Sequence, residues 1–110
     1  MVAEMLEKQG YSVELTPSSR DGGFDIYVAS KQPLGHFLYL VECKRYVPPN
    51  KVGVHLVRAL YGVVQKMRAN AGMLVTTSFF TKGAIEFADE TQYTMHLHDF
   101  ISLKKWLNLK

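Results

Sequence analysis

The sequence predicts a three-layer α/β/α sandwich with a central mixed β-sheet. The first observation is the order of the elements: a helix precedes three successive strand-like runs, and helices and strands then alternate to the C-terminus. Successive strands joined by turns pair antiparallel, whereas strands separated by a helix pair parallel, so this order gives a sheet of mixed direction. The second observation is the run at residues 37–45, which is apolar on both faces. Such a run indicates a central strand that helices cover on both sides.

The first half of the chain predicts a helix and a hairpin. The predicted elements are a helix over residues 2–9 that Gly10 ends, and strands over residues 11–15, 24–29 and 37–45. Asp25 lies at the head of the second of these strands, after two glycines, and Glu42 lies near the end of the third. A hairpin between the two strands would bring Asp25 opposite the Glu42 end, although the sequence does not fix the register.

The second half alternates helix and strand. The predicted elements are a helix over residues 54–71, a strand over 73–77, a helix over 82–91, a strand over 94–98, and a terminal helix with Asp99 as its N-cap. Apolar residues at helical spacing define the faces that we expect to be buried. They are Val54, Val57, Leu60, Tyr61, Val64 and Met67 on the first helix; Ala84, Ile85, Phe87 and Ala88 on the second; and Phe100, Leu103 and Trp106 or Leu107 on the last.

Composition sets the bounds on class and compartment. At 110 residues, of which 47% are hydrophobic and 21% charged, residues 1–110 are expected to form a single globular domain. Thirteen Lys and Arg against ten Asp and Glu permit contact with nucleic acid without requiring it. The single cysteine excludes an intrachain disulfide and a cysteine-based zinc cluster, and favours a reducing, cytoplasmic location. Because no apolar run approaches the roughly 20 residues that span a bilayer, we expect no membrane association.

Glu42 and Lys44 are the residues that suggest chemistry. Side chains two apart in a strand share a face, so these two would stand side by side while Cys43 points the other way. An acid and an amine on an apolar strand are costly to bury unless something pairs with them, and a metal ion is one such partner. The alternative is an exposed ion pair on an edge strand, against which the surrounding apolar run argues.

Two segments carry a family resemblance. Asp21-Gly22-Gly23-Phe24-Asp25 and Val41-Glu42-Cys43-Lys44-Arg45-Tyr46 resemble the signature of the PD-(D/E)xK restriction-endonuclease-like superfamily, and within it the catalytic domain of the Mrr-type (type IV) restriction endonucleases. The similarity extends to Gly10-Tyr11, Val57-Arg58-x-Leu60-x-Gly62, Val75-Thr76-Thr77, Phe80-Thr81, Ala84, Leu97-x-Asp99, Leu103 and Trp106-Leu107, and so covers nearly the whole chain. A D…ExK pair arises often by chance, so the ordered set is what makes the resemblance specific.

The chain departs from the family pattern at two places. Mrr-type domains commonly carry Gln where this chain has Glu42, and the glutamate restores the carboxylate of the wider superfamily. The first helix of the family usually begins well before the point where this chain starts, so we expect that helix to be truncated at the N-terminus.

The resemblance implies a Mg²⁺-dependent DNA endonuclease, in which Mn²⁺ substitutes for Mg²⁺ and a metal-activated water attacks the phosphodiester. Asp25, Glu42 and Lys44 would be the catalytic residues, with Lys44 orienting or deprotonating the water. Asp25, Glu42 and the backbone carbonyl of Cys43 would hold the metal, since Mg²⁺ prefers hard oxygen ligands. Gln65 and Glu4 are weaker candidates for accessory site residues, for which solvated surface positions are the alternative.

The resemblance also implies partners. Arg20, Lys51, His55 and Arg58 flank the expected site and are candidates for phosphate contacts. By analogy with the family we expect DNA as substrate, a separate recognition domain or subunit, and a homodimer on DNA. Two alternatives stay open: a catalytically inactive DNA-binding or sensing module on the same fold, and a nuclease for structured DNA or RNA.

Overall fold

The fold of the chain is given by a computed structural model, which describes residues 4, 7, 8, 10–16, 26–31 and 37–108. Its elements, in chain order, are β1 (Ser12–Thr16), β2 (Ile26–Lys31), β3 (Phe37–Lys44), α2 (Val54–Met67), β4 (Ala71–Thr76), α3 (Lys82–Glu90), β5 (Met95–His98) and α4 (Phe100–Asn108). Before β1, Gly10 adopts the left-handed conformation (φ 96°), and its N–H donates to the carbonyl of Glu7. This is the geometry expected of a glycine that ends a helix.

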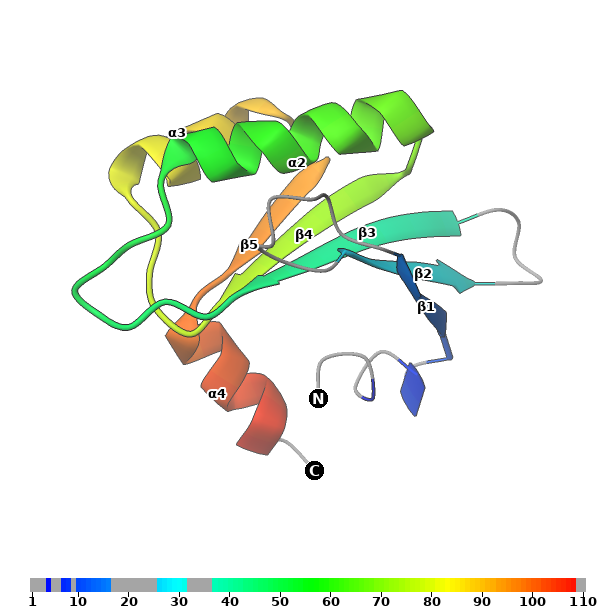
Figure 1. Cartoon of the computed structure of the whole chain (residues 1–110), viewed down its shortest axis with the longest axis horizontal. Helices are drawn as coiled ribbons and strands as arrows, with labels where there is room; N and C mark the ends of the chain where they lie inside the picture. Colours follow the sequence, from blue (N-terminus) through cyan, green and yellow to red (C-terminus); the bar gives the residue numbers. More distant parts are fainter. Residues whose placement is uncertain (1–3, 5–6, 9, 17–25, 32–36, 109–110) are drawn as a thin grey trace.

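The five strands form one sheet in the order β1-β2-β3-β4-β5. β1 and β2, and likewise β2 and β3, pair antiparallel, whereas β3 pairs parallel with β4 and β4 with β5. Helices α2 and α3 lie over one face of the sheet and α4 lies on the other (Figure 1). The predicted three-layer sandwich with a mixed sheet is therefore confirmed.

β3 is the central strand, and it contributes to both cores. Leu40 and Val41 are adjacent in the chain and both fully buried, and each belongs to a different hydrophobic cluster. The cluster of Leu40 lies beneath α2 and α3, and its buried members are Leu40, Val52, Val57, Leu60, Val64, Leu74, Phe80, Ala84, Ala88 and Met95. The cluster of Val41 lies on the α4 face and contains Met73, Val75 and Leu103. Covered on both faces and flanked on both sides, β3 can hold polar side chains away from water.

Helix α2 ends earlier than its sequence pattern predicts. Arg68 takes the left-handed conformation (φ 55°), its N–H donates to the carbonyl of Gln65, and the N–H of Ala69 donates to the carbonyl of Val64. These two bonds form a Schellman motif, which usually has glycine at the left-handed position. Because Arg68 takes that position instead, the predicted continuation to residue 71 was wrong, and Ala71 begins β4.

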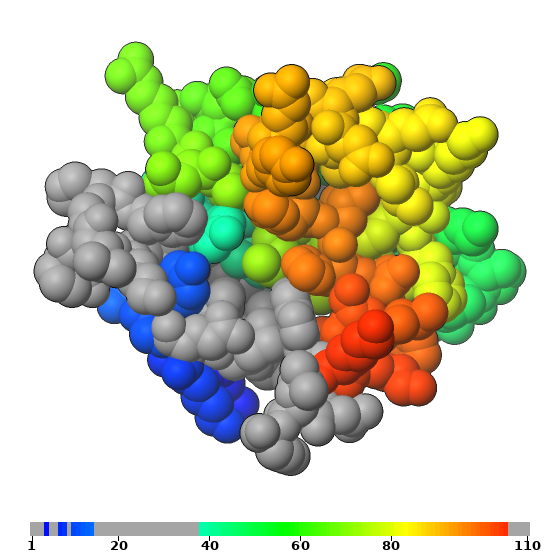
Figure 2. Space-filling view, turned by 180° about the vertical axis from the view of Figure 1, so that it is seen from behind, coloured from blue at the N-terminus to red at the C-terminus, as the bar shows by residue number. Residues whose placement is uncertain are grey.

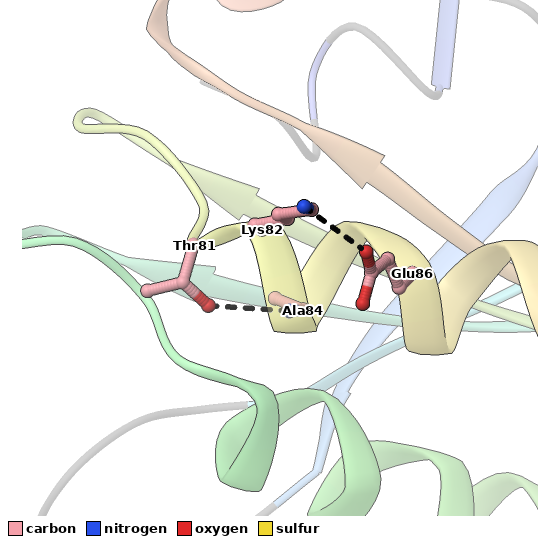
Figure 3. Close-up of polar contacts among 4 residues, drawn as sticks. All are labelled: Thr81, Lys82, Ala84 and Glu86. Carbon is pink, nitrogen blue, oxygen red and sulfur yellow. Dashed lines mark hydrogen bonds and ion pairs between the residues drawn. The ribbon is translucent and has the colours of Figure 1, made fainter.

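The N-termini of α3 and α4 are capped by side chains. The Thr81 hydroxyl accepts a hydrogen bond from the Ala84 N–H at 3.1 Å (Figure 3), and the Asp99 carboxylate accepts one from the Ser102 N–H at 3.0 Å. The predicted N-cap at Asp99 is confirmed.

Three residues predicted to be buried are instead exposed. Met67 is 44% exposed, Ile85 48% and Phe100 41%. Met67 and Phe100 are the last and first residues of their helices, where the neighbouring layer no longer covers the apolar face. Helical periodicity gives the direction of a side chain and not the extent of the surface opposite it.

β5 is an edge strand of four residues. In the view from behind, β5 (orange) is seen between α3 (yellow) and α4 (red) (Figure 2). The Thr91 hydroxyl accepts a hydrogen bond from the Met95 N–H at 3.0 Å and donates one to the Ala88 carbonyl at 2.6 Å. Among the helices of the described ranges, none has the length and apolar character that crossing a membrane requires.

Candidate active site

Glu42 and Lys44 stand on the α2/α3 face of β3. They follow Leu40, which belongs to the core beneath α2 and α3, at the same period of two residues. Cys43 packs instead with Val41 against the α4 face. The predicted alternation is confirmed, so two charged groups share the covered face of the central strand.

The two side chains form a buried ion pair. The Lys44 Nζ lies 3.7 Å from the Glu42 Oε2, and the side chains are 11% and 3% exposed. At this distance the contact is an ion pair and is too long for a hydrogen bond. Because β3 is flanked by β2 and β4, the alternative of an edge-strand pair is excluded.

The register places the pair between defined neighbours. Glu42 lies opposite Ile26 of β2 and Leu74 of β4, and Lys44 lies opposite Thr76. Asp25, the third predicted catalytic residue, directly precedes Ile26 in the sequence and lies outside the described residues. The hairpin on which the expected meeting of Asp25 and Glu42 depends is present, and the meeting itself stays a prediction.

Burial dominates the electrostatics of Glu42. Desolvation raises the pKa of this carboxyl from 4.5 to about 7, even though the positive charge of Lys44 acts to lower it. Desolvation can outweigh the attraction of a buried ion pair, because two charges taken out of water lose more hydration than one contact restores. Burial also raises the pKa of the Cys43 thiol, which makes this cysteine a poor nucleophile.

The Glu42 Oε2 is a buried oxygen that no described residue satisfies with a hydrogen bond. A buried carboxylate oxygen without a hydrogen bond is costly, and because Lys44 approaches it only to 3.7 Å, a second cation in direct contact would compensate it further. A hard oxygen donor of this kind suits Mg²⁺. Within the described ranges no group of three His, Cys, Asp or Glu side chains could hold a metal ion, so the expected set depends on Asp25.

The chain that leaves β3 after Lys44 is held by polar side chains beyond β4. The Thr77 N–H donates to the Lys44 carbonyl at 3.3 Å, and the Thr77 hydroxyl donates to the Tyr46 carbonyl at 2.8 Å. The buried Ser78 hydroxyl donates to the Asn50 carbonyl at 2.6 Å. Sequence reasoning counted Thr77 in the predicted strand and in the family resemblance, but gave neither Thr77 nor Ser78 a role at the site. The available signal was a run of hydroxyl residues directly after a buried strand.

The other predicted site residues are scattered. Lys51, His55 and Arg58 are exposed at or before the start of α2. Gln65 is exposed near the C-terminal end of α2. Just beyond that end, the Asn70 N–H donates to the Leu38 carbonyl, so this end of α2 lies near the start of β3 and not near its Lys44 end. The accessory role of Gln65 therefore stays a prediction that the position of α2 does not favour.

The roles of two further candidates, Glu4 and Arg20, stay predictions. Glu4 is exposed, as expected for a solvated helix face, and Arg20 lies outside the described residues.

A cavity of about 670 Å³ lies at the β5 edge and not at the ion pair. It is lined by α3, β5 and the start of α4, including Asp89, Tyr93, His96, His98 and Asp99. Desolvation by burial and the nearby His96 lower the pKa of His98, which favours the neutral imidazole, although the nearby Asp99 acts to raise that pKa. β4 separates this edge from β3, so the cavity is not part of the Glu42 site.

Comparison with known proteins identifies the class to which this fold belongs. The structure is similar to the DNA modification-dependent restriction endonuclease AspBHI (TM-score 0.77, 22% identity, covering 96% of this chain and 29% of that one). It is also similar to the MspJI restriction endonuclease in complex with a 27-mer oligonucleotide (TM-score 0.68, 26% identity, covering 96% of this chain and 25% of that one). The fold is therefore that of restriction endonucleases.

The sequence comparisons define the family. The family model Mrr_cat, described as "Restriction endonuclease", matches residues 1–107, and the chain belongs to this family. The type IV methyl-directed restriction enzyme EcoKMrr of Escherichia coli (strain K12) is 32% identical over 97 residues, which are 84% of this chain and 31% of that protein. The uncharacterized protein y4cE of Sinorhizobium fredii (strain NBRC 101917 / NGR234) is 34% identical over 86 residues, 78% of this chain and 22% of that protein. The chain thus spans about a fifth to a third of the length of these curated relatives.

Proposed function

We propose that the domain is a metal-dependent DNA endonuclease that hydrolyses phosphodiester bonds at Asp25, Glu42 and Lys44. The observation that carries the proposal is the buried Glu42–Lys44 pair, whose carboxylate oxygen Oε2 no described residue satisfies. Family membership supports nuclease chemistry. The oligonucleotide bound to the similar MspJI supports a nucleic acid as substrate.

Each residue has a role that follows from its chemistry. Asp25, Glu42 and the backbone carbonyl of Cys43 would hold Mg²⁺, or Mn²⁺ in its place, through oxygen atoms. A cation held by these oxygens would supply Lewis acidity, which would lower the pKa of a water and offset charge on the phosphoryl oxygens. Glu42 is kept from water by the sheet and its helices, so its charge persists only with a cation close by. Lys44 is held on the same face at 3.7 Å from Glu42, where it orients the attacking water and stabilises the charge that develops on the phosphate.

Plasmid nicking in Mg²⁺ tests the proposal. Asp25→Ala and Lys44→Ala should abolish nicking and leave the circular dichroism spectrum and the affinity for DNA near those of the wild type. Lys82→Ala is the matched control, because its amine lies on the exposed side of α3, 3.9 Å from Glu86. Cleavage that survives in both site variants would refute the assignment.

Metal titration separates this function from that of an inactive binding module. The wild-type domain should bind Mg²⁺ or Mn²⁺, and Asp25→Asn and Glu42→Gln should each remove that binding. Metal affinity that is absent from the wild type, or unchanged in both variants, would favour a DNA-binding or sensing role on the same fold.

Substrate range and assembly form the rest of the proposal. Supercoiled plasmid, linear duplex, structured DNA and RNA should be compared, each methylated and unmethylated where the substrate allows it. Preferred cleavage of RNA or of junctions would replace the duplex as substrate. We expect two copies to act together on a duplex, since each copy offers one site and a double-strand break needs two cuts. Sedimentation with and without DNA measures this.

A further inference from the structure

The outward face of α2 is basic and carries no acid. Apart from Met67 at its C-terminal end, the exposed residues of α2 recur at helical spacing. They are His55, Arg58, Ala59, Gly62, Gln65 and Lys66, which we call the α2 stripe. None of the fourteen residues of α2 is Asp or Glu. The neighbouring α3, in contrast, exposes Glu86, Asp89 and Glu90 beside one cation, Lys82, so its surface is acidic on balance. The two adjacent helices therefore present opposite charge to a polyanion, which would be drawn to α2 and repelled from α3.

The middle of the α2 stripe holds a glycine that packing within the domain does not require. A Cβ added at Gly62 would meet no described atom within 4 Å, so packing inside the domain does not require glycine there. Glycine in a helix interior lowers stability relative to alanine. Together with Ala59, Gly62 leaves a shallow strip of backbone between cations, which lets a partner's backbone approach the helix closely.

Arg58 is held in place by an aromatic ring. Its guanidinium lies 5.4 Å from the centroid of the Phe87 ring, and the same ring makes an edge contact with Tyr61 at 5.6 Å. The contact restricts a long side chain before any ligand arrives, so less conformational freedom is lost on binding. The planar guanidinium offers paired donors that match the geometry of a phosphate.

The stripe starts at the same end of the sheet as Lys44. β3 and β4 are parallel, so the intervening helix runs antiparallel to them and begins at the end of β3 that bears Lys44. The connecting segment is fixed there, because the Val52 N–H donates to the Phe79 carbonyl and the Thr81 N–H donates to the Val52 carbonyl. A polyanion that follows α2 toward His55 is therefore directed toward the end of the sheet at which Lys44 lies.

We propose that the α2 stripe binds the phosphate backbone of a DNA duplex and guides the duplex to the Glu42–Lys44 site. This inference rests on the proposed function, since it specifies the path of that substrate across the domain. Arg58 and Lys66 attract the phosphates, and the small residues Gly62 and Ala59 let the DNA backbone come close to the helix. The acidic surface of α3 repels the duplex and so keeps it along α2.

The salt dependence of duplex binding tests the charge. Binding of a labelled DNA duplex is measured in EDTA, without cleavage, between about 50 and 200 mM salt. Replacing two phosphate-contacting cations in Arg58→Gln/Lys66→Gln should lower the slope of log K against log salt by about 1.8, which makes the loss of affinity over this range about 12-fold smaller. An unchanged slope overturns the proposal.

The matched control removes the same charge from the other face of the sheet. Lys104 and Lys105 are exposed on α4, and the Lys104 amine lies 5.5 Å from the Phe100 ring centroid, much as Arg58 lies over Phe87. Lys104→Gln/Lys105→Gln should leave the slope as in the wild type. An equal fall of the slope in this variant would show a general charge effect and overturn the proposal.

A third variant tests the close approach without changing charge. Gly62→Gln should keep or raise the thermal midpoint, because glutamine favours helix, and should weaken duplex binding roughly tenfold, as expected for overpacking a tight contact. Wild-type affinity in a folded Gly62→Gln domain would overturn the proposal. Tighter binding of an RNA duplex of the same sequence would overturn DNA as the ligand.

These results distinguish the failure of this inference from the failure of the proposed function. A wild-type domain that does not nick plasmid, but whose salt slope falls in the α2 variant, refutes the nuclease and supports the stripe. If the wild type nicks plasmid, but the slope of log K against log salt is the same in the wild type and in the α2 variant, the nuclease is supported and the role of the α2 stripe is refuted.

Discussion

Replacing Glu42 by glutamine should remove a pH dependence from the stability of the domain. Burial raises the pKa of this carboxyl from 4.5 to about 7 in the folded protein. Between these values the folded chain holds a proton that the unfolded chain releases, so the free energy of unfolding falls as pH rises and levels off above the folded pKa. The difference of about 2.5 pH units (about 7 minus 4.5), at about 1.4 kcal/mol each, gives a full loss of about 3.5 kcal/mol, of which about 3 kcal/mol falls above pH 4.5.

Urea unfolding in EDTA between pH 4.5 and 8 measures this loss. The difference in unfolding free energy between the wild type and Glu42→Gln should change by about 3 kcal/mol across the range. The comparison uses the change of the unfolding free energy with pH and not its value at one pH, because the glutamine amide adds a pH-independent cost if its hydrogen bonds are not satisfied. Glu86→Gln, on the exposed side of α3, should keep the wild-type slope. A Glu42→Gln slope equal to that of the wild type would refute burial of Glu42 as the cause.

Two further predictions concern the packing of β4 and the cap of α3. Gly72→Ala should lower the unfolding free energy by about 1–3 kcal/mol, because its Cβ would lie 2.7 Å from the Val64 Cγ2 and 3.0 Å from the Met95 Sδ. In Gly62→Ala, the control in urea unfolding, the added methyl meets open space and stability should hold or rise; equal losses in the two variants would contradict the steric argument. Thr81→Ala should cost about 1 kcal/mol through the lost hydrogen bond from the Ala84 N–H (Figure 3), and Thr81→Ser should retain most of it. Thermal melts that show the same loss for serine and alanine would assign the effect to the methyl group instead of the hydroxyl.

The order and type of the elements followed from the sequence because periodicity and punctuation agree along most of the chain. Gly10 and Asp99 stand where the helix ends need them, and both have the expected geometry. The end of α2 was missed because Arg68, and not glycine, takes the left-handed position, so nothing in the sequence marks the stop.

Strand register was beyond the sequence. Alternation fixes the face on which a side chain lies and says nothing about its partner across the sheet. The pairing of Ile26 with Glu42, and of Lys44 with Thr76, comes from the packed sheet as a whole.

The candidate site was predictable in part. Glu42 and Lys44 are two positions apart on an apolar strand, which was enough to predict that they lie together on a covered face. The structure confirms this. The support of that face by Thr77 and Ser78 was not predictable, since it depends on the close approach of segments about thirty residues apart in the chain. The position of Gln65 also depended on the direction of α2 relative to β3, which only the topology supplies.

The bond between the Met95 N–H and the Thr91 hydroxyl has a consequence for the behaviour of the domain in solution. An edge strand with unbonded donors and acceptors can template the strand of a neighbouring molecule and start aggregation. β5 is only four residues long, and one of its donors is already bound within the same chain. This edge of the sheet is thus a weak template for intermolecular pairing, which favours a domain that stays dispersed at the concentrations that binding and cleavage assays require.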